Sequence, residues 1–119
     1  MTNFLSEAAS LQDYLQTVRQ TLHRTPELGN QEMKTSAYLK RVLESLGLTV
    51  ENPFGTALCA TLSGTKPGKT VALRADMDAL AITEWTGAEF ASQTPGVMHA
   101  CGHDIHMTAA IGAAILLAA

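Results

Sequence analysis

The sequence predicts an α/β fold with two helices first, strands after them and a buried helix last. Three observations support this prediction. Residues 6–47 have helical apolar spacing, residues 48–76 contain short β-branched runs, and residues 107–119 are almost wholly aliphatic. With 119 residues, of which 46% are hydrophobic and 16% charged, the chain can fold around one core.

Two amphipathic helices are expected in the first part of the chain. The first covers residues 6–25, where leucine and valine recur every three or four positions, and Pro26 ends it. The second begins after Asn30, whose side chain can cap a helix, and Gly47 ends it. Its apolar side consists of Met33, Ala37, Leu39, Val42, Leu43 and Leu46.

The apolar period then changes from helical to extended. Residues 48–52, 56–64 and 69–76 are each short and rich in β-branched residues, so we expect three strands. Residues 64–69, "GTKPGK", form a turn between the last two strands. Residues 84–96 are polar and contain glycine and proline, which predicts a loop.

The final run, "MTAAIGAAILLAA" (107–119), predicts a buried helix. It is shorter than the roughly 20 apolar residues that a membrane span needs. It ends without a polar cap, so we expect the chain to be the front part of a longer protein. A net charge of −3 without a basic cluster argues against nucleic-acid binding. The N-terminus lacks a signal-peptide pattern, which favours a cytoplasmic setting.

Two acidic residues follow the third predicted strand in "LRADMDAL" (73–80). Asp76 and Asp78 are two positions apart, so in an extended chain their carboxylates point to the same side. Adjacent carboxylates repel unless a cation or a proton lies between them. The alternative interpretation is a turn with two solvated acids.

The segment "VMHACGHDIHM" (97–107) gathers soft and nitrogen ligands just before the final helix. Cys101 and His103 offer a thiolate and an imidazole, which suit zinc, cobalt or a similar ion. Gly102 between them allows a tight turn. The alternative is a buried cysteine beside a hydrogen-bonded histidine.

Other residues in this segment have open roles. Asp104 either orients an imidazole or caps the final helix, and His99 and His106 are further candidate ligands. Two ligands do not complete a catalytic zinc site, which normally has three and a water. No glutamate stands out as a general base, because Glu84 and Glu89 lie in the predicted loop without a distinguishing pattern.

Structural roles are expected for several remaining residues. A cation is favourable near a helix C-terminus, where His23 lies. We interpret His23, Pro26 and Glu27 as structural or close to a substrate entrance. Trp85 and Phe90 are expected to cover the loop, and Cys59 to lie in the core.

Three ordered motifs give the chain a family resemblance. They are "RQTLHRTPELGNQE" (19–32), "LRADMDAL" (73–80) and "MHACGHDIHM" (98–107). Together they resemble the N-terminal part of the dinuclear-metal amidohydrolases of the aminoacylase and carboxypeptidase type. The branch most similar to the chain contains N-acyl-amino-acid amidohydrolases, hippurate hydrolase and auxin-conjugate hydrolases.

The resemblance implies that residues 1–119 are the N-terminal portion of an α/β/α catalytic domain that binds two divalent ions of zinc, manganese, cobalt or nickel. Cys101 and His103 would be metal ligands. Asp78 would orient a ligand or the base, whereas Asp76 occupies a position where other branches have a metal-binding histidine. Either acid could be the catalytic one. The full-length protein would be a homodimer or homotetramer acting on small N-acyl amino acids.

The implied reaction is metal-assisted hydrolysis of an amide bond. The metal lowers the pKa of a bound water, and a glutamate transfers its proton to the leaving amine. That glutamate, two more histidine ligands and the lid domain are expected beyond Ala119, so the chain alone should be inactive. Two alternatives are a non-catalytic metal-binding fragment or structural module, and a thiol hydrolase with Cys101 as nucleophile and His103 or His99 as base.

Overall fold

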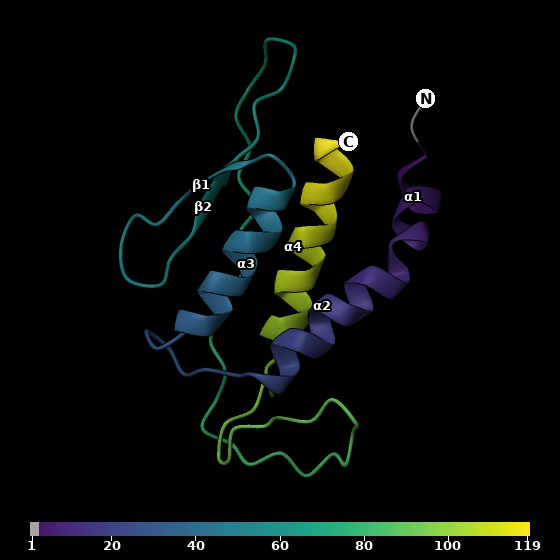
Figure 1. Ribbon diagram of the computed structural model, residues 1–119. Coiled ribbons are helices and arrows are strands. Elements are labelled where there is room, and N and C mark those ends of the chain that lie inside the picture. Colours follow the sequence, from purple (N-terminus) through teal and green to yellow (C-terminus); the bar gives the residue numbers. More distant parts are fainter. Residues whose placement is uncertain (1–2) are drawn as a thin grey trace.

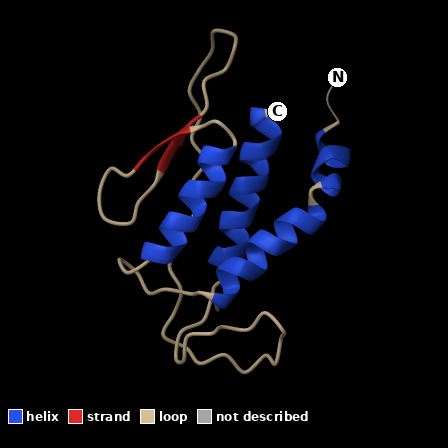
Figure 2. Ribbon diagram, in the orientation of Figure 1, coloured by secondary structure: helices blue, strands red, loops and turns tan. Residues whose placement is uncertain are grey.

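The computed structural model describes residues 3–119. Three long helices lie side by side, and a small hairpin lies at one edge of them (Figure 1; Figure 2). In chain order the elements are α1 (Phe4–Ser10), α2 (Gln12–Arg24), α3 (Met33–Ser45), β1 (Thr49–Glu51), β2 (Cys59–Thr61) and α4 (His103–Ala118). The predicted α/β class and the order of helices, strands and final helix are confirmed.

The hydrophobic core lies where α2, α3 and α4 meet. Each helix contributes two buried residues, spaced three or four positions apart as the sequence pattern predicts. They are Val18 and Leu22, Leu39 and Val42, and Met107 and Ile111. Burying an aliphatic side chain of this size stabilises a fold by roughly 1.5–3 kcal/mol. This shared cluster therefore packs α2, α3 and α4 against one another.

A glycine allows α2 and α4 to approach closely. Gly112 is buried, and a Cβ atom at this position would lie 3.1 Å from Leu15 Cδ1. Any larger residue would push the two helices apart or displace the leucine side chain.

The first helix differs in detail from the prediction. It begins at Phe4 instead of residue 6, with Asn3 Oδ1 accepting a hydrogen bond from the Ser6 N–H at 3.2 Å. Leu11 separates α1 from α2, where its N–H bonds the Ala8 carbonyl at 3.1 Å and tightens the turn. The predicted end before Pro26 is confirmed.

The start of α3 corrects the second prediction. Asn30 has a left-handed φ of +66° and lies outside the helix, so it is not the cap. The N-cap position belongs to Glu32, whose own side chain makes no capping bond. The first turn is instead capped from outside the helix by Glu27, whose carboxylate accepts from the Thr35 N–H at 2.7 Å and the Lys34 N–H at 3.1 Å. Glu27 thus has the structural role that the sequence predicted.

The predicted end of α3 at Gly47 is confirmed. Gly47 has a φ of +81°, which a residue with a side chain rarely adopts. Its N–H bonds the Glu44 carbonyl at 2.9 Å, and the Leu48 N–H bonds the Leu43 carbonyl at 3.4 Å. These two bonds form a Schellman motif.

Two of the three predicted strands are present in shortened form. β1 and β2 pair antiparallel, with Val50 opposite Ala60. Asn52 Nδ2 holds their connection by donating to the carbonyls of Gly55 at 3.0 Å and Ala57 at 2.7 Å. The core position predicted for Cys59 is wrong, because β2 is exposed along its whole length.

The third predicted strand, residues 69–76, does not form. Val71 and Leu73 are 84% and 68% exposed, and the described residues provide no strand beside this segment. A strand needs a neighbour for its backbone hydrogen bonds, so a β-branched run alone remains extended without becoming part of a sheet.

The final helix is confirmed at residues 103–118, but it is buried on one side only. Met107 and Ile111 face the core, whereas Ile105 and Leu117 are more than half exposed. Within the described residues, no helix has the length and hydropathy that a membrane crossing requires.

Replacing Glu27 with alanine is expected to destabilise the fold. The change removes the acceptor for two N–H groups in the first turn of α3, and loss of a helix cap costs about 1 kcal/mol. Urea denaturation would measure the free energy of unfolding. Glu44→Ala, in an exposed pair with Lys40, is the control and should change it by less than about 0.5 kcal/mol. Equal losses for both variants would contradict the capping role.

Candidate metal-binding site

Backbone hydrogen bonds bring together the two motifs that carry the candidate site residues, 73–80 and 97–107. The Ala79 N–H bonds the Glu27 carbonyl at 2.8 Å, just after α2. Leu80 and Met98 exchange N–H to carbonyl bonds at 2.9 and 3.0 Å. The segment that carries Asp76 and Asp78 therefore lies beside the turn that leads into α4.

His103 lies between the two acids of the first motif. Its Nδ1 is 3.0 Å from both the backbone carbonyl and Oδ1 of Asp78. Its Nε2 is 3.7 Å from Asp76 Oδ2. The imidazole is largely buried, and both carboxylates are about 40% exposed. Arg74 also pairs with Asp76, at 2.6 Å.

These contacts define which imidazole nitrogen is available to a ligand. Both groups near Nδ1 are oxygen acceptors, so Nδ1 carries a proton and donates it toward Asp78. On a neutral ring Nε2 then presents its lone pair toward the Asp76 carboxylate. A proton or a metal ion at that position relieves the repulsion between the two electron-rich groups.

Cys101 lies on the turn before α4. Its side chain is exposed, and Gly102 follows with a φ of +91°, the left-handed conformation expected for a tight turn. His106 lies one helical turn beyond His103, with ring centroids 5.7 Å apart. The thiol, imidazole and carboxylate donors suit a divalent ion. Within residues 3–119, however, no three such side chains converge tightly enough to hold one, so the described residues do not form a closed metal site by themselves.

A second group of charged side chains was missed by the sequence analysis. The imidazole of His23, in the last turn of α2, lies between Asp104 and Glu84. Its Nδ1 is 2.8 Å from Asp104 Oδ2, and its Nε2 is 3.0 Å from Glu84 Oε1. Arg19 Nε also donates to Asp104 Oδ2, at 2.9 Å. The side chains of His23, Asp104 and Glu84 are 4%, 0% and 3% exposed.

The sequence offered two roles for Asp104: capping the final helix or orienting an imidazole. Asp104 does not cap α4, and the imidazole that it contacts is not one of the candidate metal ligands. Gly102 occupies the cap position of α4, and the imidazole is that of His23. Burial alone would raise the pKa of Asp104. Hydrogen bonds from His23 and Arg19 outweigh burial and hold the pKa below its ordinary value.

Glu84 is the buried anchor of the predicted loop. It accepts hydrogen bonds from the Ser92 N–H at 2.8 Å and from the Thr86 hydroxyl. Burial would raise the pKa of Glu84, but these bonds and the contact with His23 lower it overall. No local pattern identifies this glutamate, because its partner His23 is 61 residues away in sequence.

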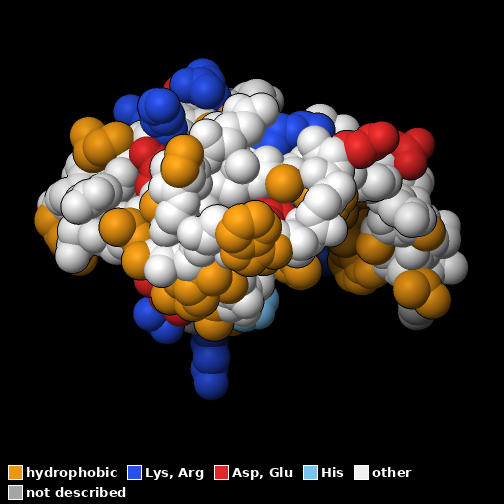
Figure 3. Space-filling model, turned by 90° about the horizontal axis from the view of Figure 1, so that it is seen from below, with side chains coloured by type: hydrophobic (Ala, Val, Ile, Leu, Met, Phe, Trp, Pro, Cys, Tyr) orange, Lys and Arg blue, Asp and Glu red, His pale blue; other side chains and the backbone are white. Residues whose placement is uncertain are grey.

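The loop around Glu84 is only partly covered by its aromatic residues. Trp85 is 90% exposed, so the prediction that it covers the loop is wrong. Phe90 does provide cover: its ring meets the His23 ring edge-on at 5.4 Å, and the Arg19 guanidinium lies 4.8 Å from its centroid. Seen from the end of the molecule where this loop lies, hydrophobic side chains gather over the middle of the surface (Figure 3).

His99 is buried beside this cluster. Among residues 3–119, neither ring nitrogen has a hydrogen-bond partner, and the ring centroid is 6.5 Å from that of His23. Burial lowers the pKa of His99, although the negative charge of Asp104 acts in the opposite direction.

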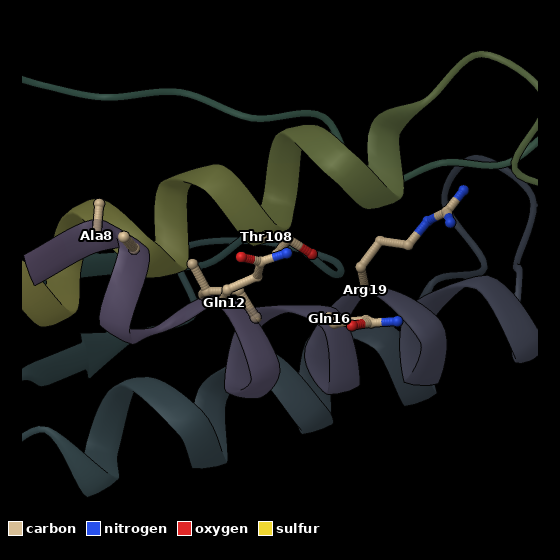
Figure 4. A pocket seen from close by; sticks show the side chains of 7 residues that line it. Ala8, Gln12, Gln16, Arg19 and Thr108 are labelled. Carbon is tan, nitrogen blue, oxygen red and sulfur yellow. The ribbon is translucent and has the colours of Figure 1, made fainter. Parts of the chain in front are cut away.

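One surface depression lies apart from the two motifs. It has a volume of about 560 Å³ and is lined by residues of α1, α2 and α4, including Gln12, Gln16 and Thr108. Figure 4 shows Arg19 extending from α2 past this depression toward the start of α4, where it meets Asp104. The depression contains none of the candidate metal ligands, so it carries no part of the proposed chemistry.

Stability is expected to fall in acid because of Glu84. Its pKa is lower in the folded chain than its ordinary value of 4.5, so its stabilising contribution is complete above that value and is lost as the pH falls through the folded pKa. Glu84→Gln should therefore lower the free energy of unfolding at neutral pH by about 1.5–3 kcal/mol.

The difference in the free energy of unfolding between Glu84→Gln and the natural chain should become smaller as the pH falls below about 4.5. Urea denaturation at a series of pH values measures it. Glu89→Gln, at an exposed position of the same loop, is the control. A difference that stays constant with pH would contradict the role given to Glu84.

Comparison with known proteins supports one family. Residues 72–119 match the model of peptidase family M20/M25/M40. The chain is 45% identical to thermostable carboxypeptidase 2 of Saccharolobus solfataricus, covering 94% of this chain and 29% of that protein. It is 52% identical to N-acetyldiaminopimelate deacetylase of Bacillus subtilis, covering 80% of this chain and 26% of that protein.

A solved structure agrees with the sequence matches. The crystal structure of a Bacillus subtilis protein, described as a dinuclear metal binding peptidase of the M20 family, superposes with a TM-score of 0.87 at 39% identity. The match covers 92% of this chain and 31% of that one. The chain thus spans less than a third of the length of these relatives. The shared motifs, the matched fold and the identity over most of its length show that this chain belongs to peptidase family M20/M25/M40.

Proposed function

We propose that this chain supplies one side of the metal centre of a hydrolase that cleaves the amide bond of N-acyl amino acids. The observation that carries the proposal is the position of His103, whose Nδ1 bonds Asp78 while its Nε2 faces Asp76. Cys101 lies two residues before it on the same turn. This arrangement offers an oriented imidazole and a thiol at one place on the surface.

Each of the four residues has a distinct proposed role. Asp78 holds the His103 ring by accepting from Nδ1, which leaves Nε2 to face a ligand. Cys101 supplies a second donor as its thiolate. Asp76 keeps a negative charge beside Nε2 and accepts from Arg74. A divalent ion bound here would polarise the substrate carbonyl and activate a water molecule.

The substrate class is proposed from the names of the relatives. A deacetylase of N-acetyldiaminopimelate removes an acetyl group from an amino acid nitrogen, and this relative is 52% identical over the matched region. A carboxypeptidase is the second candidate, because thermostable carboxypeptidase 2 is 45% identical over more of the chain. Parallel assays on N-acetyl amino acids and on dipeptides with the corresponding longer protein would separate the two.

Further groups are needed to complete the reaction. Within residues 3–119, Glu84 is engaged by His23, and no glutamate stands beside His103 as a general base. We propose that residues 1–119 form the N-terminal portion of a longer catalytic domain, whose remaining parts supply the base and further ligands. We also propose two ions of zinc, manganese, cobalt or nickel per subunit, a cytoplasmic setting and a dimer or tetramer of the longer protein.

A thiol hydrolase is the alternative that uses the same residues. Cys101 is exposed, but His103 Nδ1 is already bonded to Asp78, and no cysteine–histidine hydrogen bond occurs in the described part of the chain. Inhibition of the longer protein distinguishes the two chemistries. Chelator should abolish amide hydrolysis by a metal enzyme, and added metal should restore it. Iodoacetamide inhibition that is independent of metal would favour the thiol enzyme.

Metal binding by the chain itself can be tested with Co²⁺. Cys101→Ser and His103→Ala should each weaken binding at least about tenfold, since each removes a donor. The thiolate-to-cobalt charge-transfer absorption should also disappear in Cys101→Ser. Cys59→Ser is the matched control, because this exposed thiol lies on β2, away from the motif. Equal losses for the two cysteine variants would contradict the proposed site.

The chain of 119 residues is expected to show no turnover of N-acetyl amino acids, even with added Mn²⁺. The physical reason is that the described residues hold neither a placed base nor three converging ligands. A ninhydrin assay of the free amino acid that is released measures turnover. Turnover comparable to that of a longer relative assayed in parallel would show the expectation to be wrong.

A further inference from the structure

We propose that His23 is a positioning residue: its buried bridge to Asp104 and Glu84 holds the first turn of α4 so that His103 stays against Asp78. The bridge joins α2, α4 and the loop of residues 81–97, which share no strand pairing within residues 3–119. The inference deepens the proposed function, and its catalytic meaning rests on that proposal.

The His23 ring is suited to hold two carboxylates at once. Nδ1 faces Asp104 Oδ2 at 2.8 Å, and Nε2 faces Glu84 Oε1 at 3.0 Å. A neutral imidazole has a single N–H, so both contacts are hydrogen bonds only when the ring carries both protons. Charge-assisted hydrogen bonds away from water are short and directional, and they restrain all three side chains.

The first turn of α4 depends on Asp104 for its orientation. Among the described residues, no side chain caps the start of α4, and the N–H groups of Ile105 and His106 bond the Gly102 carbonyl at 3.0 and 3.1 Å. Neighbouring residues on a helix point about 100° apart. With Asp104 directed into the protein toward α2, its neighbour His103 is directed toward the segment that carries Asp78.

Glu84 extends the same restraint to the loop. Its carboxylate accepts from the Ser92 N–H at 2.8 Å, and the next residue, Gln93, donates to the Arg24 carbonyl at 2.9 Å. At the base of the loop Leu80 pairs with Met98. Asp78 precedes this base and Cys101 follows it. Glu84 restrains the loop between them, so it also restrains the position of the Asp78 segment relative to the Cys101 segment.

The decisive variant is His23→Gln, which has no charge. Its two N–H donors lie on one nitrogen and its oxygen only accepts, so it cannot place a donor at each of the two positions that the ring nitrogens occupy. Long-range ¹H–¹⁵N spectra of the metal-free chain report the proton on His103 Nδ1 and its bond to Asp78. We expect the His103 ring signals of His23→Gln to shift toward those of a solvent-exposed histidine. The Co²⁺ dissociation constant should rise about tenfold or more, as is typical when a group that orients a ligand is removed.

Two controls separate positioning from a general loss of stability. Val42→Ala removes core packing in α3, which takes no part in the bridge, and should leave both the His103 signals and cobalt affinity unchanged in the folded chain. Glu89→Gln changes an exposed carboxylate of the same loop and should also have no effect. If His23→Gln does not fold, Glu84→Gln replaces it, because the amide keeps an acceptor for Ser92 but weakens the His23 contact.

The His103 ring signals decide whether His23 is a positioning residue. Altered His103 signals in the bridge variant, with unaltered signals in Val42→Ala, support positioning by His23. Unchanged His103 signals in the bridge variant, or equal changes in both variants, overturn it. Failure of the natural chain to bind Co²⁺ would refute the proposed metal site, while the His103 signals of the metal-free variants would still decide the role of His23.

Discussion

The fold depends on a pair of carboxylates buried around one imidazole. Asp104 lies on α4 and Glu84 on the preceding loop, and His23 on α2, which faces both, is 81 and 61 residues away from them in the sequence. Burying one such carboxylate without a partner would cost several kcal/mol. The chain therefore cannot move the loop or the start of α4 without breaking this bridge, and the two chemical motifs are attached to those same segments.

The apolar core and the ionic bridge act at different parts of the same helices. The core cluster holds α2, α3 and α4 side by side through residues such as Leu22, Leu39 and Ile111. Side-chain bonds act at the helix ends: Glu27 holds the start of α3, and Asp104 holds the start of α4. Hydrophobic burial thus provides most of the stability, and the charged groups provide the orientation that a binding site requires.

The candidate site is partly exposed to solvent. The carboxylates of Asp76 and Asp78 are about 40% exposed, and Cys101 is exposed. The neighbouring segment of residues 69–76 is extended without a strand beside it. The chain covers less than a third of the length of its relatives, and we propose that further parts of a longer protein complete this site.

The sequence by itself determined the features that depend on near neighbours. Apolar spacing predicted α2, α3 and α4, and Gly47 and Pro26 predicted helix ends because their backbone preferences act locally. The order and spacing of the three motifs predicted the family. The sequence also singled out Asp76, Asp78 and His103, which the structure brings together, whereas the metal-binding role of Cys101 and His103 stays a prediction.

Only the tertiary structure decided the features that depend on distant partners. Residues 69–76 have the composition of a strand but lack a pairing neighbour, so the predicted strand does not form. Glu84 is a buried ionic partner because His23, 61 residues away, meets it. Asp104 turns away from His103 to bind Arg19 and His23 instead. Ion pairs and strand pairing are set by contacts across the fold, and no local pattern encodes which distant group will arrive.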